Sequence, residues 1–258
     1  GDMAGDLAGD IAGELAGDMA GEMLDPQQLP DPTPPPVLSP DPSPVPLFPY
    51  SVASGDPRFD SITLWTALDP SLASQLMIGS EPLIVELQLT TLSDETFESP
   101  LVETSLITDS TRGFTVKERV NGLTADQRYR FRFFYRTDDG ELTYSHVGYT
   151  RTAPIEVDEV RLAVCSCANY SSGYFHTYRY IALREDLHAV LHLGDYIYES
   201  PSLGDEGTRS LEQATEAYDL ESYRARYAEY RLDPDLQALH RAHPMISVWD
   251  DHEFTNDS

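Results

Sequence analysis

The chain has 258 residues, of which 40% are hydrophobic, so it is long enough for one or two domains with buried cores. Its 44 acidic and 17 basic residues give a formal net charge of -27, which opposes general binding to nucleic acid through a broad basic surface. No stretch approaches the roughly 20 apolar residues that cross a bilayer, and the start of the chain lacks the pattern of a secretory signal. The two cysteines, Cys165 and Cys167, are too few for a disulfide framework.

The first 50 residues have a composition unlike the rest of the chain. Residues 1–24 are six tetrapeptides beginning GDMAGDLA, and residues 25–49 hold eleven prolines. A glycine in each repeat costs a helix about 1 kcal/mol relative to alanine, and proline-rich sequence favours an extended spacer. We therefore expect residues 1–50 to be a disordered acidic repeat and linker, with the folded chain beginning near Ser51.

Residues 61–150 alternate apolar and polar positions and are rich in aromatic and β-branched residues, which is typical of strands. The predicted strands are SITLWTAL, LIVELQLT, LVETSLIT, FTVKERV, RYRFRFFYR and ELTYSHVGYT. Leu123 lies six residues before Tyr129, a spacing found at a strand corner of fibronectin and immunoglobulin-like domains, although an ordinary buried tyrosine explains it equally well. The pattern predicts a small β-sandwich.

After Pro154 the pattern changes to strands that alternate with helices. We predict a buried strand over residues 160–167, a helix within 174–187 and a second strand within 188–195. A strand, helix and strand in this order favour a right-handed crossover and a parallel pair.

A second helical region precedes a third strand. Tyr223, Tyr227 and Tyr230 recur at helical spacing, which we interpret as core packing. Asp233 and Pro234 are suited to begin another helix, and the sequence MISVWD that follows it predicts the third strand.

Potential ligands follow the carboxyl end of each of these three strands. They are Cys167 after the first, Asp195 and Tyr198 after the second, and Asp250, Asp251 and His252 after the third. Ligands bind at this edge of open α/β sheets, and carboxylates crowded there repel one another unless a multivalent cation is present. The pattern therefore predicts a metal site. Thiolate, phenolate and carboxylate ligands suit Fe³⁺, while the remaining carboxylate and amide oxygens suit Ca²⁺ or Mg²⁺.

Several segments resemble the PhoD-like alkaline phosphatases, also called alkaline phosphatase D. The resemblance is carried by residues 51–68, 166–179, 192–199 and 223–257. The motifs HLGDYIYE and WDDHE within them also resemble a divergent metallophosphoesterase signature.

This resemblance implies a protein of the α+β or α/β class. Residues 51–153 would form an immunoglobulin-like domain, and residues 154–258 the first part of a metallophosphoesterase domain, a β-sandwich flanked by helices. It implies a hydrolase of phosphate monoesters and diesters that uses Fe³⁺, Ca²⁺ and a metal-bound hydroxide. It also implies export, so the protein would be secreted, periplasmic or on the cell surface; we expect a monomer.

The resemblance further implies roles for individual residues. The metal ligands would be Cys167, Asp195, Tyr198, Asp251 and Asn256. Cys167 and Tyr198 would bind iron and Asp195 would bridge two metals, while the second metal's ligand among Asp250, Asp251 and Asn256 stays open. His252 would bind phosphate or protonate the leaving oxygen.

The later metal-binding motifs of such domains do not occur before Ser258, so we expect a catalytic domain truncated at its C-terminus and poorly active alone. Two alternatives remain at this stage. One is a phosphodiesterase of the phospholipase D type. The other is a non-catalytic surface or adhesion module that binds calcium.

Overall fold

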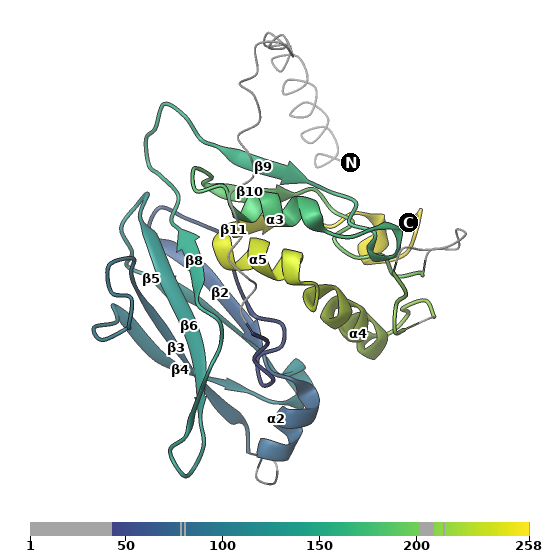
Figure 1. Ribbon diagram of the computed structural model, residues 1–258, viewed down its shortest axis with the longest axis horizontal. Helices are drawn as coiled ribbons and strands as arrows, with labels where there is room; N and C mark the ends of the chain where they lie inside the picture. The colour runs from purple at the N-terminus through teal and green to yellow at the C-terminus, as the bar shows by residue number, and fades with distance from the viewer. Residues whose placement is uncertain (1–42, 78, 80, 202–208, 214, 258) are drawn as a thin grey trace, which may run out of the picture. The chain divides into compact units, whose positions relative to one another are not determined.

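The computed structural model describes residues 43–77, 79, 81–201, 209–213 and 215–257, and Figure 1 shows their arrangement. The strands are β1 (Val52–Gly55), β2 (Ser61–Ala67), β3 (Leu83–Thr91), β4 (Val102–Thr108), β5 (Thr115–Asn121), β6 (Arg128–Arg136), β7 (Leu142–Tyr144), β8 (Gly148–Arg151), β9 (Leu162–Cys165), β10 (Ala189–His192) and β11 (Pro244–Ser247). The helices are α2 (Pro70–Leu76), α3 (His176–Ala182), α4 (Leu220–Arg231) and α5 (Pro234–Ala242). Short 3-10 turns are η1 (Ser110–Arg112), η2 (Tyr170–Ser172) and η3 (Asp251–Glu253).

The strands form two sheets. One has six strands in the order β5-β2-β1-β11-β10-β9, and the other has the order β4-β3-β6-β7, with β8 also paired to β6. Residues of β2, β3 and β6 that point inward are fully buried and pack together, among them Ile62, Leu64, Leu87, Phe131 and Phe133. Burial of each such side chain contributes about 1.5–3 kcal/mol, so the alternating pattern of the sequence corresponds to a real apolar core.

The buried core begins earlier than Ser51, contrary to our expectation. Leu47 is 7% exposed and Phe48 is 0% exposed, and both pack against the core of β2, β3 and β6. The end of the proline-rich stretch is therefore part of the packed structure, because its last apolar residues are needed to cover that core. The acidic repeat and most of the linker lie outside the described residues.

Tyr129 adopts the contact that its spacing suggested. Its side chain is 2% exposed, and its hydroxyl accepts a hydrogen bond from the backbone N–H of Thr124 at 2.9 Å. The assignment of these strands to an immunoglobulin-like domain remains a prediction.

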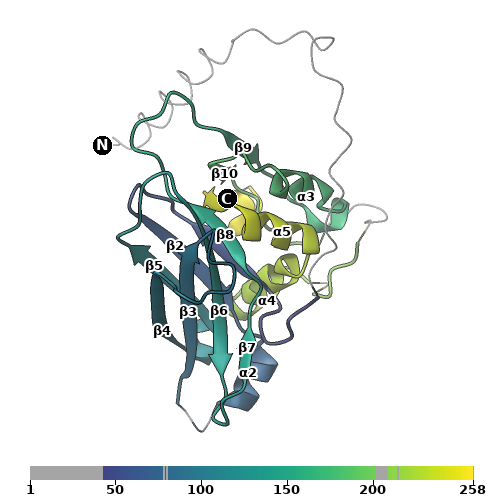
Figure 2. The same ribbon diagram turned by 60° about the vertical axis from the view of Figure 1, so that its left-hand side comes forward.

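The parallel arrangement predicted after Pro154 is confirmed. β10 pairs in parallel with both β9 and β11. Helices α3 and α5 lie against one face of these strands (Figures 1 and 2), where Tyr178, Leu236 and Leu239 pack against Val190 and Met245.

A strand lies within residues 160–167 as predicted, but it is not buried. β9 is shorter and lies at the edge of its sheet. Leu162 and Val164 are 41% and 58% exposed, because the helices in the described part of the chain lie on the opposite face of β9, where Ala163 and Cys165 pack.

Strand β1 connects the two halves of the sequence. It pairs antiparallel with β2 and parallel with β11, and a Cβ at Gly55 would lie 2.8 Å from the carbonyl oxygen of Met245. Glycine is therefore needed for this close approach. Strands from both sides of residue 154 share one sheet, and the proposed domain boundaries remain predictions.

In the part of the chain described, no helix has the length and apolar character needed to span a bilayer.

Candidate metal centre

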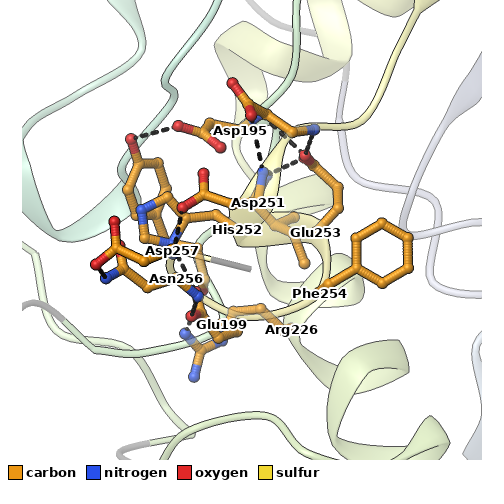
Figure 3. Close-up of polar contacts among 12 residues, drawn as sticks. Asp195, Glu199, Arg226, Asp251, His252, Glu253, Phe254, Asn256 and Asp257 are labelled. Carbon is orange, nitrogen blue, oxygen red and sulfur yellow. Dashed lines mark hydrogen bonds and ion pairs between the residues drawn. The ribbon is translucent and has the colours of Figure 1, made fainter. Parts of the chain in front are cut away.

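The site lies where β10 and β11 end and their connecting loops meet. Gly194 has φ of 103° and Asp195 has φ of 51°, so the chain turns sharply directly after β10. This left-handed backbone is rare for residues other than glycine and aspartate or asparagine. The turn places Asp195 beside the η3 segment that follows β11 (Figure 3).

Asp195, Asp251 and His252 form a group with the geometry of a cation site. Each offers one ligand atom, and the three atoms lie within 4.8 Å of one another. Asp195 is 7% exposed, and its Oδ1 is buried without a hydrogen-bond partner among the described residues. A buried carboxylate oxygen without a partner is unfavourable, and a bound cation would satisfy it. The residues present therefore fit a metal ion.

Tyr198 and Cys167 lie next to this group. The Tyr198 hydroxyl donates a hydrogen bond to Oδ2 of Asp195 at 3.2 Å. Burial raises the pKa of Tyr198, and the charges of Asp195 and the Cys167 thiol, with their hydrogen bonds, raise it further. Cys167 is exposed and also has a left-handed backbone, with φ of 56°. It is close to Tyr198 but outside the group of three.

His252 is held by a buried carboxylate. Its Nδ1 donates a hydrogen bond to Glu199 at 2.8 Å, and Glu199 is 1% exposed. Burial acts to lower the pKa of His252, but the hydrogen bond and charge of Glu199, with the charges of Asp195 and Asp251, raise it overall. The ring centroid of Tyr198 lies 4.0 Å from that of His252. The imidazole is therefore fixed in orientation by Glu199.

The three candidates left open after β11 have different surroundings. Asp250 accepts a hydrogen bond from the backbone N–H of Asp251 at 3.0 Å and caps η3. Asp251 accepts a bond from the backbone N–H of Asp257 at 2.6 Å, which lowers its pKa and keeps it ionised. The amide Nδ2 of Asn256 donates to Asp257 at 2.8 Å, which leaves its Oδ1 outside that bond. Of the two aspartates, Asp251 is the one grouped with Asp195.

The sequence reasoning missed three residues that position the site. They are Glu199, Glu253 and Tyr230. The Tyr230 hydroxyl accepts hydrogen bonds from the backbone N–H groups of Tyr170 and Tyr198, at 3.0 Å and 3.2 Å. The one local signal was the spacing of Asp250 and Glu253, which is that of a capping box.

Comparisons with known proteins agree with this architecture. The family model described as the N-terminal domain of PhoD-like phosphatase matches residues 36–154, and the model of PhoD-like phosphatase matches residues 162–257. Alkaline phosphatase D of Bacillus subtilis (strain 168) is 35% identical over 215 residues, which cover 81% of this chain and 36% of that protein. This chain therefore spans little more than a third of the curated relative.

Two solved structures also match. A structure of PhoD has a TM-score of 0.70 and 34% identity, covering 85% of this chain and 41% of the other. The purple acid phosphatase PPD1 from yellow lupin (Lupinus luteus) seeds has a TM-score of 0.52 and 15% identity, covering 79% and 35% of the two chains, which shows a likeness of fold. With both family models matched and these relatives aligned over most of its length, the chain belongs to the PhoD-like phosphatases.

Proposed function

We propose that this protein is a cation-dependent hydrolase of phosphoric esters. The observation that carries the proposal is the group formed by Asp195, Asp251 and His252, with an unpartnered buried oxygen on Asp195. Membership of the PhoD-like phosphatases and the likeness to alkaline phosphatase D support the same chemistry. On the family resemblance we also propose that the substrate is a phosphate monoester or diester and that the protein is exported.

The types of donor atom suggest which residues would bind each of two cations. The carboxylate of Asp195, the phenol of Tyr198 and the thiol of Cys167 form a set that suits Fe³⁺, and the oxygens of Asp251 and Asn256 suit Ca²⁺. Bound cations would supply the Lewis acidity that lowers the pKa of a water molecule and offsets the charge on the phosphoryl oxygens.

The chain itself provides proton transfer to the leaving group. His252 has a raised pKa, so it can carry a proton on Nε2 while Nδ1 remains bonded to Glu199. Donation from Nε2 to the leaving oxygen produces a neutral imidazole, whose proton Glu199 keeps on Nδ1. His252 would therefore be the general acid and not a cation ligand, because its Nε2 cannot hold a proton and a cation at once, and Glu199 would be the residue that orients it.

The Asp195→Asn variant tests this function. It keeps the size of the side chain but removes the charge and replaces one carboxylate oxygen with an amide nitrogen. We expect the purified parent chain to contain iron and calcium by elemental analysis and the variant to lose most of both. The matched control is Asp138→Asn, at an exposed aspartate between β6 and β7, which should retain them.

Turnover is the second measurement. Because we expect the parent chain to be poorly active, hydrolysis of a monoester, a diester and a phospholipid by the parent, the variant and the control would be compared relative to the low rate of the parent. Loss of hydrolysis in Asp195→Asn alone supports the proposal, and the preferred substrate separates a phosphatase from a phosphodiesterase of the phospholipase D type. Unchanged metal content and turnover in Asp195→Asn, or calcium bound without iron at low affinity, would overturn it.

A further inference from the structure

The loops after β10 and β11 touch at Gly194. A Cβ built on Gly194 would lie 2.5 Å from the Cβ of Asp250 and 2.8 Å from its backbone nitrogen. Real Cβ atoms do not approach so closely, so the two loops are packed backbone against backbone. Their contact sets the separation of Asp195 and Asp251, because each of these residues directly follows one of the touching residues.

One side chain forms hydrogen bonds with both loops at this contact. Oε2 of Glu253 accepts from the backbone N–H of Asp195 at 3.0 Å and from that of Asp250 at 2.7 Å. Oε1 accepts from the backbone N–H of Tyr196 at 2.6 Å and more weakly from that of Ile197 at 3.4 Å. Figure 3 shows Glu253 on the opposite side of its loop from His252, reaching toward the backbone of Asp195.

Two simpler roles do not account for these bonds. A capping box explains the bond to Asp250, three residues away, but not the bonds to Asp195 and Tyr196, which lie 58 and 57 residues away in sequence. Glu253 is also outside the group of possible ligands formed by the described residues. Both of its oxygens are engaged by backbone donors, which a metal ligand could not keep in full.

We propose that Glu253 is a positioning residue that fastens the loop of Asp195 to the loop of Asp251 before any cation binds. The negative charge suits this role because a carboxylate has only acceptor sites, so it can serve several N–H donors at once. Glu253 thereby preforms the spacing of the two carboxylates. The expected effect on cation affinity rests on the proposed function. The hydrogen bonds by which Glu253 joins the two loops can be tested without cations.

Amide hydrogen exchange of the parent chain and of Glu253→Gln, without added cations, tests the fastening. Glutamine places an NH₂ group where one oxygen stood, so the bonds at Oε1 or those at Oε2 are lost. We expect the amides that lose their acceptor, either that of Tyr196 or those of Asp195 and Asp250, to exchange about 10- to 100-fold faster in the variant, and the amides of β2 and β3 to be unchanged. Glu141→Gln, at an exposed glutamate before β7, is the matched control and should resemble the parent. Unchanged exchange at both sets of amides would overturn the proposal.

Calorimetric titration with Mn²⁺ and with Ca²⁺ tests the expected effect on cation affinity. We expect Glu253→Gln to bind about 10- to 100-fold more weakly than the parent, as for other residues that orient metal ligands. Glu253→Asp retains the charge but is one methylene too short to reach both loops, so it should bind as weakly as the glutamine variant. Parent-like affinity of Glu253→Asp would show that charge alone matters and would overturn positioning. If the parent binds neither cation, the proposed function fails, while hydrogen exchange still decides the role of Glu253.

Discussion

Nδ1 of His252 donates a 2.8 Å hydrogen bond to the carboxylate of Glu199, although the two residues lie 53 positions apart. The other oxygen of Glu199 accepts from the backbone N–H of Asn256, also at 2.8 Å. Burial acts to raise the pKa of Glu199, but these hydrogen bonds hold it below its ordinary value, so the group stays ionised. Glu199 thus anchors both the imidazole and the segment that follows η3.

Replacing Glu199 with Gln should therefore destabilise the chain. The variant keeps the size of the side chain but loses a buried charge that accepts two hydrogen bonds, and we expect the free energy of unfolding to fall by about 1.5–3 kcal/mol. Urea denaturation near neutral pH, without added cations, measures the change. Glu185→Gln, at an exposed glutamate, should change stability by less than about 0.5 kcal/mol. Equal stability of the two variants would mean that the buried pair contributes nothing.

Gly194→Ala should cost more than the same change at Gly140. Both glycines have positive φ, 103° and 90°, so both variants strain the backbone. Only at Gly194 would the new Cβ overlap a neighbour, Asp250; nothing lies within 4 Å at Gly140. We expect Gly140→Ala to lose about 1–2 kcal/mol and Gly194→Ala to lose clearly more, measured as free energy of unfolding. Similar losses would show that the loops can separate without cost.

The hydroxyl of Tyr230 offers another test of how the site is held. This residue is 0% exposed, and its oxygen accepts the N–H groups of Tyr170 and Tyr198. Tyr230→Phe leaves both donors without their partner, which costs about 1–3 kcal/mol for each buried group. Tyr180→Phe, at a side chain that is 54% exposed, is the control and should be nearly neutral. A Tyr230→Phe variant as stable as this control would show that water replaces the hydroxyl.

Much of the fold could be predicted because burial leaves a periodic pattern in the sequence. The strands β2 to β6 follow the alternation of apolar residues, and α5 begins where Asp233 and Pro234 predicted it. Strand β1 was missed because it has only four residues and ends in Gly55. Its partner β11 lies near the other end of the chain, and local patterns carry no information about such distant pairing.

The candidate site shows the same difference between what local patterns predict and what depends on distant contacts. Asp195, Asp251 and His252 were predicted because each follows a strand of one parallel set, and the topology brings such ends together. Glu199, Glu253 and Tyr230 were missed because they bond to backbone donors or side chains of distant loops, which impose no spacing on the sequence. For Tyr230, core packing was the correct interpretation of its burial but did not foresee the use of its hydroxyl.

Acidification should destabilise the chain before its carboxylates titrate. Burial first, then the charges of Arg231 and His192, hold the pKa of His240 well below its ordinary value of 6.5. Burial lowers the pKa of His146, His192 and His243 as well. The unfolded chain therefore binds more protons than the folded chain below about pH 6.5, so stability is greatest above this pH and falls as the pH decreases. His252, with its raised pKa, acts in the opposite direction but is a single residue against four.

The His240→Gln variant isolates one part of this dependence. In the parent, each neutral buried histidine contributes up to about 1.4 kcal/mol per pH unit to the slope of stability below its unfolded pKa. Urea denaturation between about pH 6.5 and pH 5.5 should give a shallower slope for His240→Gln, even if the variant is less stable throughout because the bond from Nε2 to the hydroxyl of Tyr196 is altered. A slope equal to that of the parent would mean that His240 is protonated in the folded chain. That result would contradict its burial beside Tyr196, because a charged imidazole there would lack a compensating carboxylate.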